Sequence, residues 1–103
     1  MNLQEIKTLF EKSGIKIAYH HFETPQKLPY GIFYSPSADV LTADGVNYFT
    51  QLEIVAEIYT SKKDPATESA FENVITAAEI PFSKSESYIE SEKTYQITYE
   101  MRL

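Results

Sequence analysis

The chain has 103 residues and no cysteine, and its 15 acidic and 9 basic side chains give a net charge of −6. This length fits one domain. The acidic excess argues against sequence-independent nucleic-acid binding, which needs clustered lysine and arginine. The lack of cysteine excludes disulfides, thiolate metal sites and cysteine nucleophiles. Aromatic residues make up 14% of the chain, which favours a folded, sheet-rich protein over a disordered one.

The acidic residues are unevenly distributed. Residues 1–63 contain seven acidic and six basic side chains, a net charge of −1, whereas residues 64–103 contain eight and three, a net charge of −5. We therefore expect one side of the molecule to be negative. Residues 1–10 lack the apolar core of a signal peptide, and no run approaches the roughly 18 apolar residues that span a bilayer. These features predict a cytoplasmic protein without membrane contact.

The first predicted element is a short amphipathic helix over residues 2–13. Asn2 is a suitable N-cap and Gly14 a suitable stop. Apolar residues recur at helical spacing within it, at Leu3, Ile6, Leu9 and Phe10. A β-type run follows at residues 15–22 and leads into a loop that contains two prolines.

A second strand is predicted over residues 30–35, because large residues alternate there until Pro36. Residues 37–45 are interpreted as a mobile connection with a turn at Asp44-Gly45. A long strand then occupies residues 46–60. Its last part alternates clearly, with Leu52, Ile54, Ala56 and Ile58 on one face and Glu53, Val55, Glu57 and Tyr59 on the other.

The strongest helix signal begins at Asp64, an N-cap residue followed by Pro65 at the first helical position. Glu68 lies near the positive end of this helix dipole. The expected buried stripe consists of Ala66, Ala70, Phe71, Val74, Ala77 and Ala78, and the helix has to end before Pro81. A hairpin closes the chain, with Tyr95, Ile97, Tyr99 and Met101 on one face and Gln96, Thr98, Glu100 and Arg102 on the other.

The predicted fold is a single α+β domain with the order α-β-β-β-α-β-β. It has a mostly antiparallel sheet of about five strands, with two helices packed on one face. The other face then stays open to water or to another chain. Glu53, Glu57 and Glu100 are expected on this open face, which makes it acidic.

No pattern of catalysis, metal binding or cofactor binding is found. Lys62 and Lys63 lack the glycine-rich backbone or further cations of a phosphate site, so we interpret them as corner residues that are solvated or form ion pairs with another protein. His20 and His21 are adjacent on a predicted strand and so point to opposite faces, which disfavours a shared metal with Glu23. Glu53 and Glu57 are about 13 Å apart along the strand, too far for a two-carboxylate hydrolase.

Three segments occur in a familiar order: YGIFY with Tyr30, Gly31 and Tyr34, the junction EIYTSKKD, and the hairpin YIESEKTYQITYE. Together they resemble the small tail-terminator (tail-completion) proteins of long-tailed, siphovirus-type bacteriophages and prophages of Gram-positive bacteria. The resemblance covers residues 29–103 and concerns layout rather than any catalytic motif. His20 and His21 correspond to nothing in that family.

The resemblance implies a structural, non-enzymatic protein without cofactor. Such proteins form a homohexameric ring on the head-proximal end of the tail tube, stop tube growth and offer a surface to the head-completion connector. The isolated chain is then expected to be a monomer or a ring in the host cytoplasm and a ring in the virion, with DNA passing through unbound. Acids that line the channel would keep DNA from sticking; the candidates are Glu53, Glu57, Glu100 and the hairpin residues 85–92.

Candidate contacts with neighbouring subunits or partners are Lys62, Lys63, Glu90, Glu92 and Arg102. Two alternatives stay open. Another head-tail neck or connector component shares the size and the ring symmetry. A stand-alone α+β domain that binds a protein or a small ligand also fits the pattern.

Overall fold

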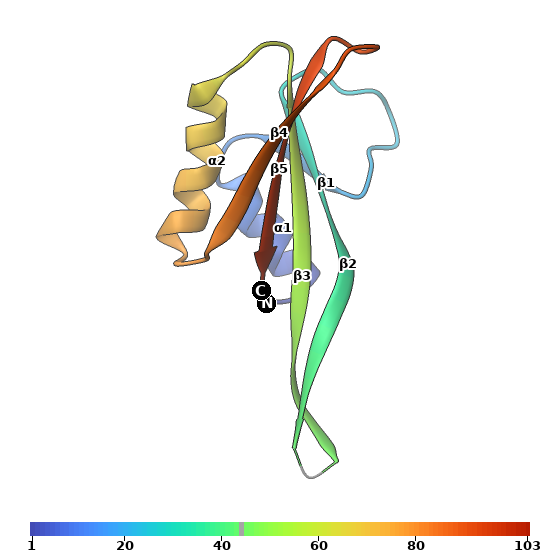
Figure 1. Cartoon of the computed structure of the whole chain (residues 1–103), viewed down its shortest axis with the longest axis vertical. Helices are drawn as coiled ribbons and strands as arrows, with labels where there is room; N and C mark the ends of the chain where they lie inside the picture. The colour runs from blue at the N-terminus through green and yellow to red at the C-terminus, as the bar shows by residue number, and fades with distance from the viewer. Residues whose placement is uncertain (44) are drawn as a thin grey trace.

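The structure is a computed structural model that describes residues 1–43 and 45–103. Within them the chain forms two helices and one five-stranded sheet in the predicted order (Figure 1). The elements are α1 (Leu3–Glu11), β1 (Lys16–Tyr19), β2 (Tyr30–Ala43), β3 (Val46–Thr60), α2 (Pro65–Ala77), β4 (Phe82–Ile89) and β5 (Thr94–Arg102). The sheet order is β1-β2-β3-β5-β4, with β1 and β2 parallel and the other pairs antiparallel. The fold class is therefore α+β, as predicted.

The ends of α1 and α2 follow the capping signals. Asn2 accepts a hydrogen bond from the Glu5 backbone, and the Glu5 carboxylate accepts one from the Asn2 backbone, which completes a capping box. Asp64 accepts from the backbone of Thr67 at the start of α2. Gly14 adopts a left-handed φ of 83° just after α1. Neither described helix is long and apolar enough to cross a membrane.

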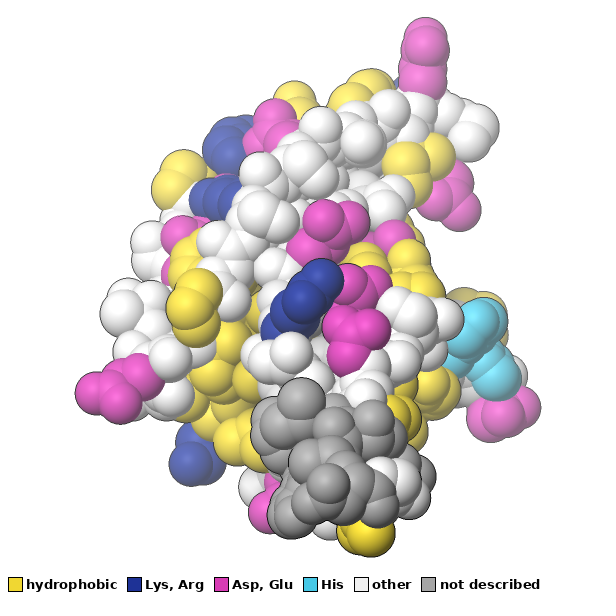
Figure 2. All heavy atoms as spheres, turned by 60° about the horizontal axis from the view of Figure 1, so that its bottom comes forward, with side chains coloured by type: hydrophobic (Ala, Val, Ile, Leu, Met, Phe, Trp, Pro, Cys, Tyr) yellow, Lys and Arg dark blue, Asp and Glu magenta, His cyan; other side chains and the backbone are white. Residues whose placement is uncertain are grey.

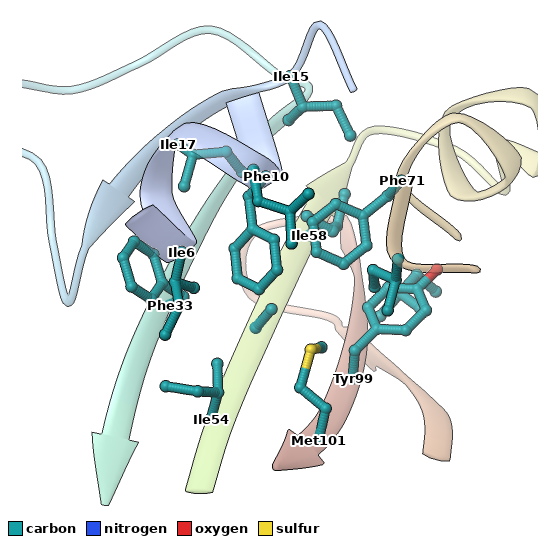
Figure 3. Close-up of a cluster of buried hydrophobic side chains, with 14 residues drawn as sticks. Ile6, Phe10, Ile15, Ile17, Phe33, Ile54, Ile58, Phe71, Tyr99 and Met101 are labelled. Carbon is teal, nitrogen blue, oxygen red and sulfur yellow. The ribbon is translucent and has the colours of Figure 1, made fainter. Parts of the chain in front are cut away.

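The core lies between the sheet and the helices, which cover the same face (Figure 1). Phe10 of α1 joins the two layers, because its ring lies 5.5 Å from that of Phe33 on β2 and 5.0 Å from that of Phe71 on α2 (Figure 3). The sheet contributes fully buried side chains at alternate positions, namely Ile54, Ala56 and Ile58 of β3 and Ile97 and Tyr99 of β5. The predicted alternation of β3 and β5 is confirmed.

The buried stripe of α2 differs from the prediction. Its buried residues are Glu68, Phe71 and Ile75, whereas Ala66 and Ala77 are exposed. Positions three and four residues from Phe71 lie over each other on a helix, so the stripe is centred on these three residues. The prediction followed the small apolar residues and missed Ile75 and the burial of a glutamate.

The strand predicted over residues 15–22 is shorter than expected. β1 ends at Tyr19 because His20 adopts a left-handed φ of 66°, which turns the chain away from the sheet. His20 and His21 therefore lie after the strand and do not alternate across it, so the prediction that their side chains point to opposite faces of a strand was wrong.

The connection predicted over residues 37–45 is largely strand instead. β2 continues through Pro36 to Ala43, because the ladder to β3 shifts register between Tyr34 and Ser37, at the place where proline offers no N–H. Asp44 of the predicted turn lies outside the described residues, and Gly45 has a φ of 75°.

Beyond the bulge the β2–β3 hairpin projects from the body of the molecule (Figure 1). We call residues 37–43 of β2 and residues 46–51 of β3 the arm. Both outer sides of the arm are free of strands within the described residues, because β1 pairs with β2 only up to Phe33 and β5 ends at Arg102. The molecule consequently measures 52 × 27 × 21 Å.

Candidate assembly surface

The face of the sheet opposite the helices carries the acids that the alternation predicted. Glu53 is paired in register with Arg102, and Glu57 with Thr98, while Glu100 is paired with Val55. Among the described residues of β3 and β5, three carboxylates and one guanidinium lie on this face. Figure 2 shows acidic side chains (magenta) close together near the centre of the view, next to basic atoms (dark blue). The open face has a net negative charge.

Glu53 is largely compensated. Its Oε2 accepts a hydrogen bond from Ser37 Oγ at 2.7 Å, and its Oε1 accepts one from Arg102 Nη2 at 3.1 Å. The Ser37 hydrogen bond and the Arg102 charge hold the pKa of Glu53 below its usual value. Arg102 Nη1 also lies 3.6 Å from Asp39 Oδ2 on the arm. Arg102 therefore links the base of the arm to the sheet, where the sequence suggested only a partner contact.

Glu57 contacts no cation among the described residues, so its negative charge is not compensated. Its two oxygens accept hydrogen bonds from neutral donors, Tyr59 Oη and Gln96 Nε2, both at 2.9 Å. Burial raises the pKa of Tyr59, and the hydrogen bond to Glu57 raises it further, so this hydroxyl stays a donor at neutral pH. The Tyr59 ring stacks on Tyr30 at 5.2 Å, which fixes the donor.

Glu100 is exposed and, in the part of the chain that the structure describes, has no ion-pair partner within 4 Å. Its negative charge acts on the hydroxyl group of Tyr34 on β2. Burial raises the pKa of Tyr34, and the negative charges of Glu57 and Glu100 raise it further. The negative potential of the open face therefore centres on Glu57 and Glu100 rather than on Glu53.

The two lysines at the β3–α2 corner differ in their contacts. Lys62 is exposed. Lys63 donates to Glu68 Oε1 at 3.0 Å and to Glu86 Oε1 at 2.6 Å, and these carboxylates raise the pKa of its ammonium. We expected both lysines to be solvated or to contact another protein. The structure shows that Lys63 forms ion pairs within its own chain, and Lys62 stays a candidate contact for a partner.

Glu68 is the centre of this intrachain cluster. Its side chain is 4% exposed, and Lys84 Nζ lies 2.7 Å from its Oε1. Lys84 also contacts Glu72 at 2.7 Å, and Glu72 accepts a 2.7 Å hydrogen bond from the buried Tyr99 hydroxyl. The cluster joins α2 to β4, β5 and the corner before α2. Sequence reasoning missed it, although Glu68 lies three residues before Phe71 and so on the same helical face.

Glu90 and Glu92 lie in the β4–β5 turn and are exposed. A hydrogen bond from the Glu92 backbone to the Ile89 carbonyl closes this turn. The turn is at the opposite end of the molecule from the arm (Figure 1). The structure therefore does not bring these two candidate contacts together with Glu53 and Arg102.

His20 and His21 line a surface hollow of about 430 Å³ together with Glu23 and the aromatic residues Phe22, Tyr30 and Tyr59. His21 Nε2 lies 3.4 Å from Glu23 Oε1, but the two side chains are 64% and 93% exposed. No group of three potential metal-ligating side chains occurs among the described residues. The hollow is thus lined by aromatic side chains. The His21 imidazole and the Glu23 carboxylate are exposed to solvent and do not form an enclosed site.

Comparison with known proteins adds no identification. No protein-family model matches the chain, and no curated protein matches it significantly. The function is therefore inferred from the sequence pattern and from the geometry of this surface.

Proposed function

We propose that this chain is a structural subunit of the phage tail-terminator type. In this role it forms a ring on the head-proximal end of the tail tube, ends tube growth and joins the head-completion connector. The observation that carries the proposal is that α1 and α2 cover only one face of the sheet, while the other face is open and acidic. The sequence resemblance over residues 29–103 supports the same role.

The dimensions of the subunit agree with this role. A domain of 52 × 27 × 21 Å cannot surround a DNA passage alone, so a channel requires several copies. Head-to-tail contacts that close produce a ring, and an elongated domain with an exposed face and free strand edges is suited to them. DNA then passes the subunits without specific binding.

The open face supports a channel-lining role through Glu57 and Glu100. Both are uncompensated by a cation within the described residues, so they repel the DNA backbone. Glu53 contributes less, because Arg102 pairs with it. Of the three predicted acids on the sheet, Glu57 and Glu100 are therefore the stronger candidates for the channel lining.

A tube-growth assay tests the proposal. Tail tubes from the phage or prophage that encodes the chain should stop growing when the protein is added, and electron microscopy should show a ring at one end of each tube. In this setting Glu100→Lys should leave the ring intact and slow DNA passage or ejection. Glu11→Lys, which makes the same charge change at an exposed position on α1, is the matched control. Unchanged tube length and bare tube ends would contradict the proposal.

The other neck component differs from a tail terminator by its position. Labelled protein found on the head vertex instead of the tube end would favour that alternative.

A ligand-binding domain is favoured by one observation, the aromatic hollow beside His20 and His21. That function would be supported if the protein stays monomeric at high concentration and a small ligand shifts the NMR signals of Tyr30 and Tyr59.

A further inference from the structure

The edges of the sheet differ in how they are protected against strand addition. β4 forms one edge, and its side chains at alternate positions are charged and tied to other elements, Lys84 to α2 and Glu86 to Lys63. β1 forms the other edge and has only four residues before His20 turns the chain away. Charged side chains and short strands are the usual means of blocking edge pairing.

The arm has little of this protection, although its ladder shifts register between Leu41 and Thr42. Residues 46–51 contain no charged residue, proline or glycine, and residues 37–43 contain one charged residue, Asp39. Asp39 in turn faces Arg102 of its own chain at 3.6 Å. Two-stranded ribbons are only marginally stable in water, and an unprotected edge of β-prone residues is a template for another strand.

Backbone geometry shows which groups of β3 are free. Leu52 exchanges two hydrogen bonds with Leu103, at 2.6 and 2.8 Å, so its N–H and C=O point toward β5. Alternate residues of a strand point their backbone groups to the same side. Thr50 therefore also directs its N–H and C=O to the β5 side, where the described chain provides no strand. Gln51 points the opposite way, toward Asp39 of β2.

We propose that the arm is a strand-pairing element, in which residues 46–51 of one copy pair antiparallel with residues 37–43 of the arm of a second copy. This inference deepens the proposed function, on which it rests for the closure of a ring. The second copy is the partner that the geometry favours, because each arm has one free β3 edge and one free β2 edge of similar length.

Head-to-tail pairing satisfies both edges of every arm. A symmetric pair of two β3 edges would leave both β2 edges open, and it would form a closed dimer. Pairing of a β3 edge with a β2 edge instead continues from copy to copy and can close into a ring. Electrostatic repulsion between adjacent arms is reduced, because Arg102 lies beside Asp39 in each copy, although Arg102 also pairs with Glu53.

Proline substitution on the arm tests this pairing. Thr50→Pro removes a backbone N–H that points to the open edge, and edge strands tolerate proline there. The variant should keep the circular dichroism and melting temperature of the parent protein and lose at least tenfold in association constant by analytical ultracentrifugation. Gln51→Pro is the matched control, since it removes an N–H directed at β2 and should disrupt the hairpin itself.

The outcomes separate this inference from the proposed function. Parent rings that persist in folded Thr50→Pro would overturn arm pairing and leave the ring function standing. A parent protein that pairs through its arms without closing rings would support arm pairing and count against the ring function. A parent protein that stays monomeric at millimolar concentration and on tail tubes would overturn arm pairing.

Disulfide trapping provides a second readout, because the chain contains no cysteine. Val40 is 48% exposed and Thr50 is also exposed, and they are partners across the hairpin within one chain. An equal mixture of the single variants Val40→Cys and Thr50→Cys should form mixed disulfides between copies, since adjacent strands bring such positions within disulfide reach. Disulfides only between identical variants would contradict the pairing of a β3 edge with a β2 edge.

Discussion

Glu68 offers the sharpest test of how the described fold is held together. Its carboxylate is 4% exposed and contacts two ammonium groups, Lys63 Nζ at 3.0 Å and Lys84 Nζ at 2.7 Å. Glu68→Gln keeps the shape of the side chain and removes its charge. Because a buried charge network has lost its central anion, we expect the free energy of unfolding to decrease.

The size of the decrease in unfolding free energy depends on the ion pairs that Lys63 and Lys84 keep. Removing one partner of a buried ion pair typically costs about 3–5 kcal/mol when the other charge is stranded. Here Lys84 keeps Glu72 at 2.7 Å and Lys63 keeps Glu86 at 2.6 Å, and both ammoniums reach solvent. The loss is therefore smaller, about 2 kcal/mol, close to the value of one hydrogen bond to a charged group. For a domain of this size that lowers the melting temperature by about 8–16 °C.

The contribution of Glu68 to stability should decrease as the pH falls. Burial alone would raise the pKa of Glu68, but Lys63 and Lys84 outweigh it and hold that pKa below the ordinary value. A depressed carboxylate pKa stabilises the fold above the unfolded-state value of about 4.3 and loses this contribution as the pH falls through the folded value. The parent protein should therefore lose more stability between pH 7 and pH 3 than the Glu68→Gln variant does.

Urea unfolding at pH 7 and pH 3, followed by circular dichroism, measures both quantities. Glu86→Gln is the matched control, because this carboxylate contacts Lys63 but is 43% exposed. A Glu68→Gln variant as stable as the parent at pH 7, or one with the same loss on acidification, would refute the reasoning about the cluster.

Two further substitutions test the packing below the open face. Gly31→Ala would place a Cβ 2.7 Å from the Cδ1 atoms of both Ile17 and Ile58, so we expect overpacking of about 1–3 kcal/mol, measured by thermal unfolding. A variant as stable as the parent would show that the isoleucines relax freely. Tyr99→Phe removes the hydroxyl that donates to Glu72 and should cost about 1–2 kcal/mol; since burial and Glu72 raise the pKa of Tyr99, alkaline absorbance titration should also show one late-ionising tyrosine fewer. Identical titration curves would contradict this assignment.

Local signals predicted much of the fold. Asn2 and Asp64 marked the helix starts because a capping side chain acts on backbone groups two or three residues away. The faces of β3 and β5 followed from the two-residue period of a strand. The extent of β2 did not follow, because Pro36 normally ends a strand and the register shift that accommodates it depends on pairing with β3.

The sequence predicted which residues lie on the candidate surface. It did not predict which of their charges are compensated by a partner. Alternation placed Glu53, Glu57 and Glu100 on one face, but the neutralisation of Glu53 depends on its register with Arg102, a residue 49 positions away. The burial of Glu68 likewise depends on where β4 places Lys84. Sequence period determines the face of a side chain, and long-range pairing determines its partner.

The position of Arg102 connects the open face with the arm. Because it contacts both Glu53 and Asp39, it reduces the charge of these two carboxylates from −2 to −1 at the end of the face from which the arm projects. The uncompensated Glu57 and Glu100 lie farther into the body of the sheet. A ring built through the arms would thus have partly compensated charges at the contacts between copies and uncompensated negative charges on the face that we propose lines the channel. Removing Arg102 would place like charges beside the pairing edge, so Arg102→Gln should weaken association of the copies more at low salt than at high salt, and equal weakening at both would contradict this electrostatic role.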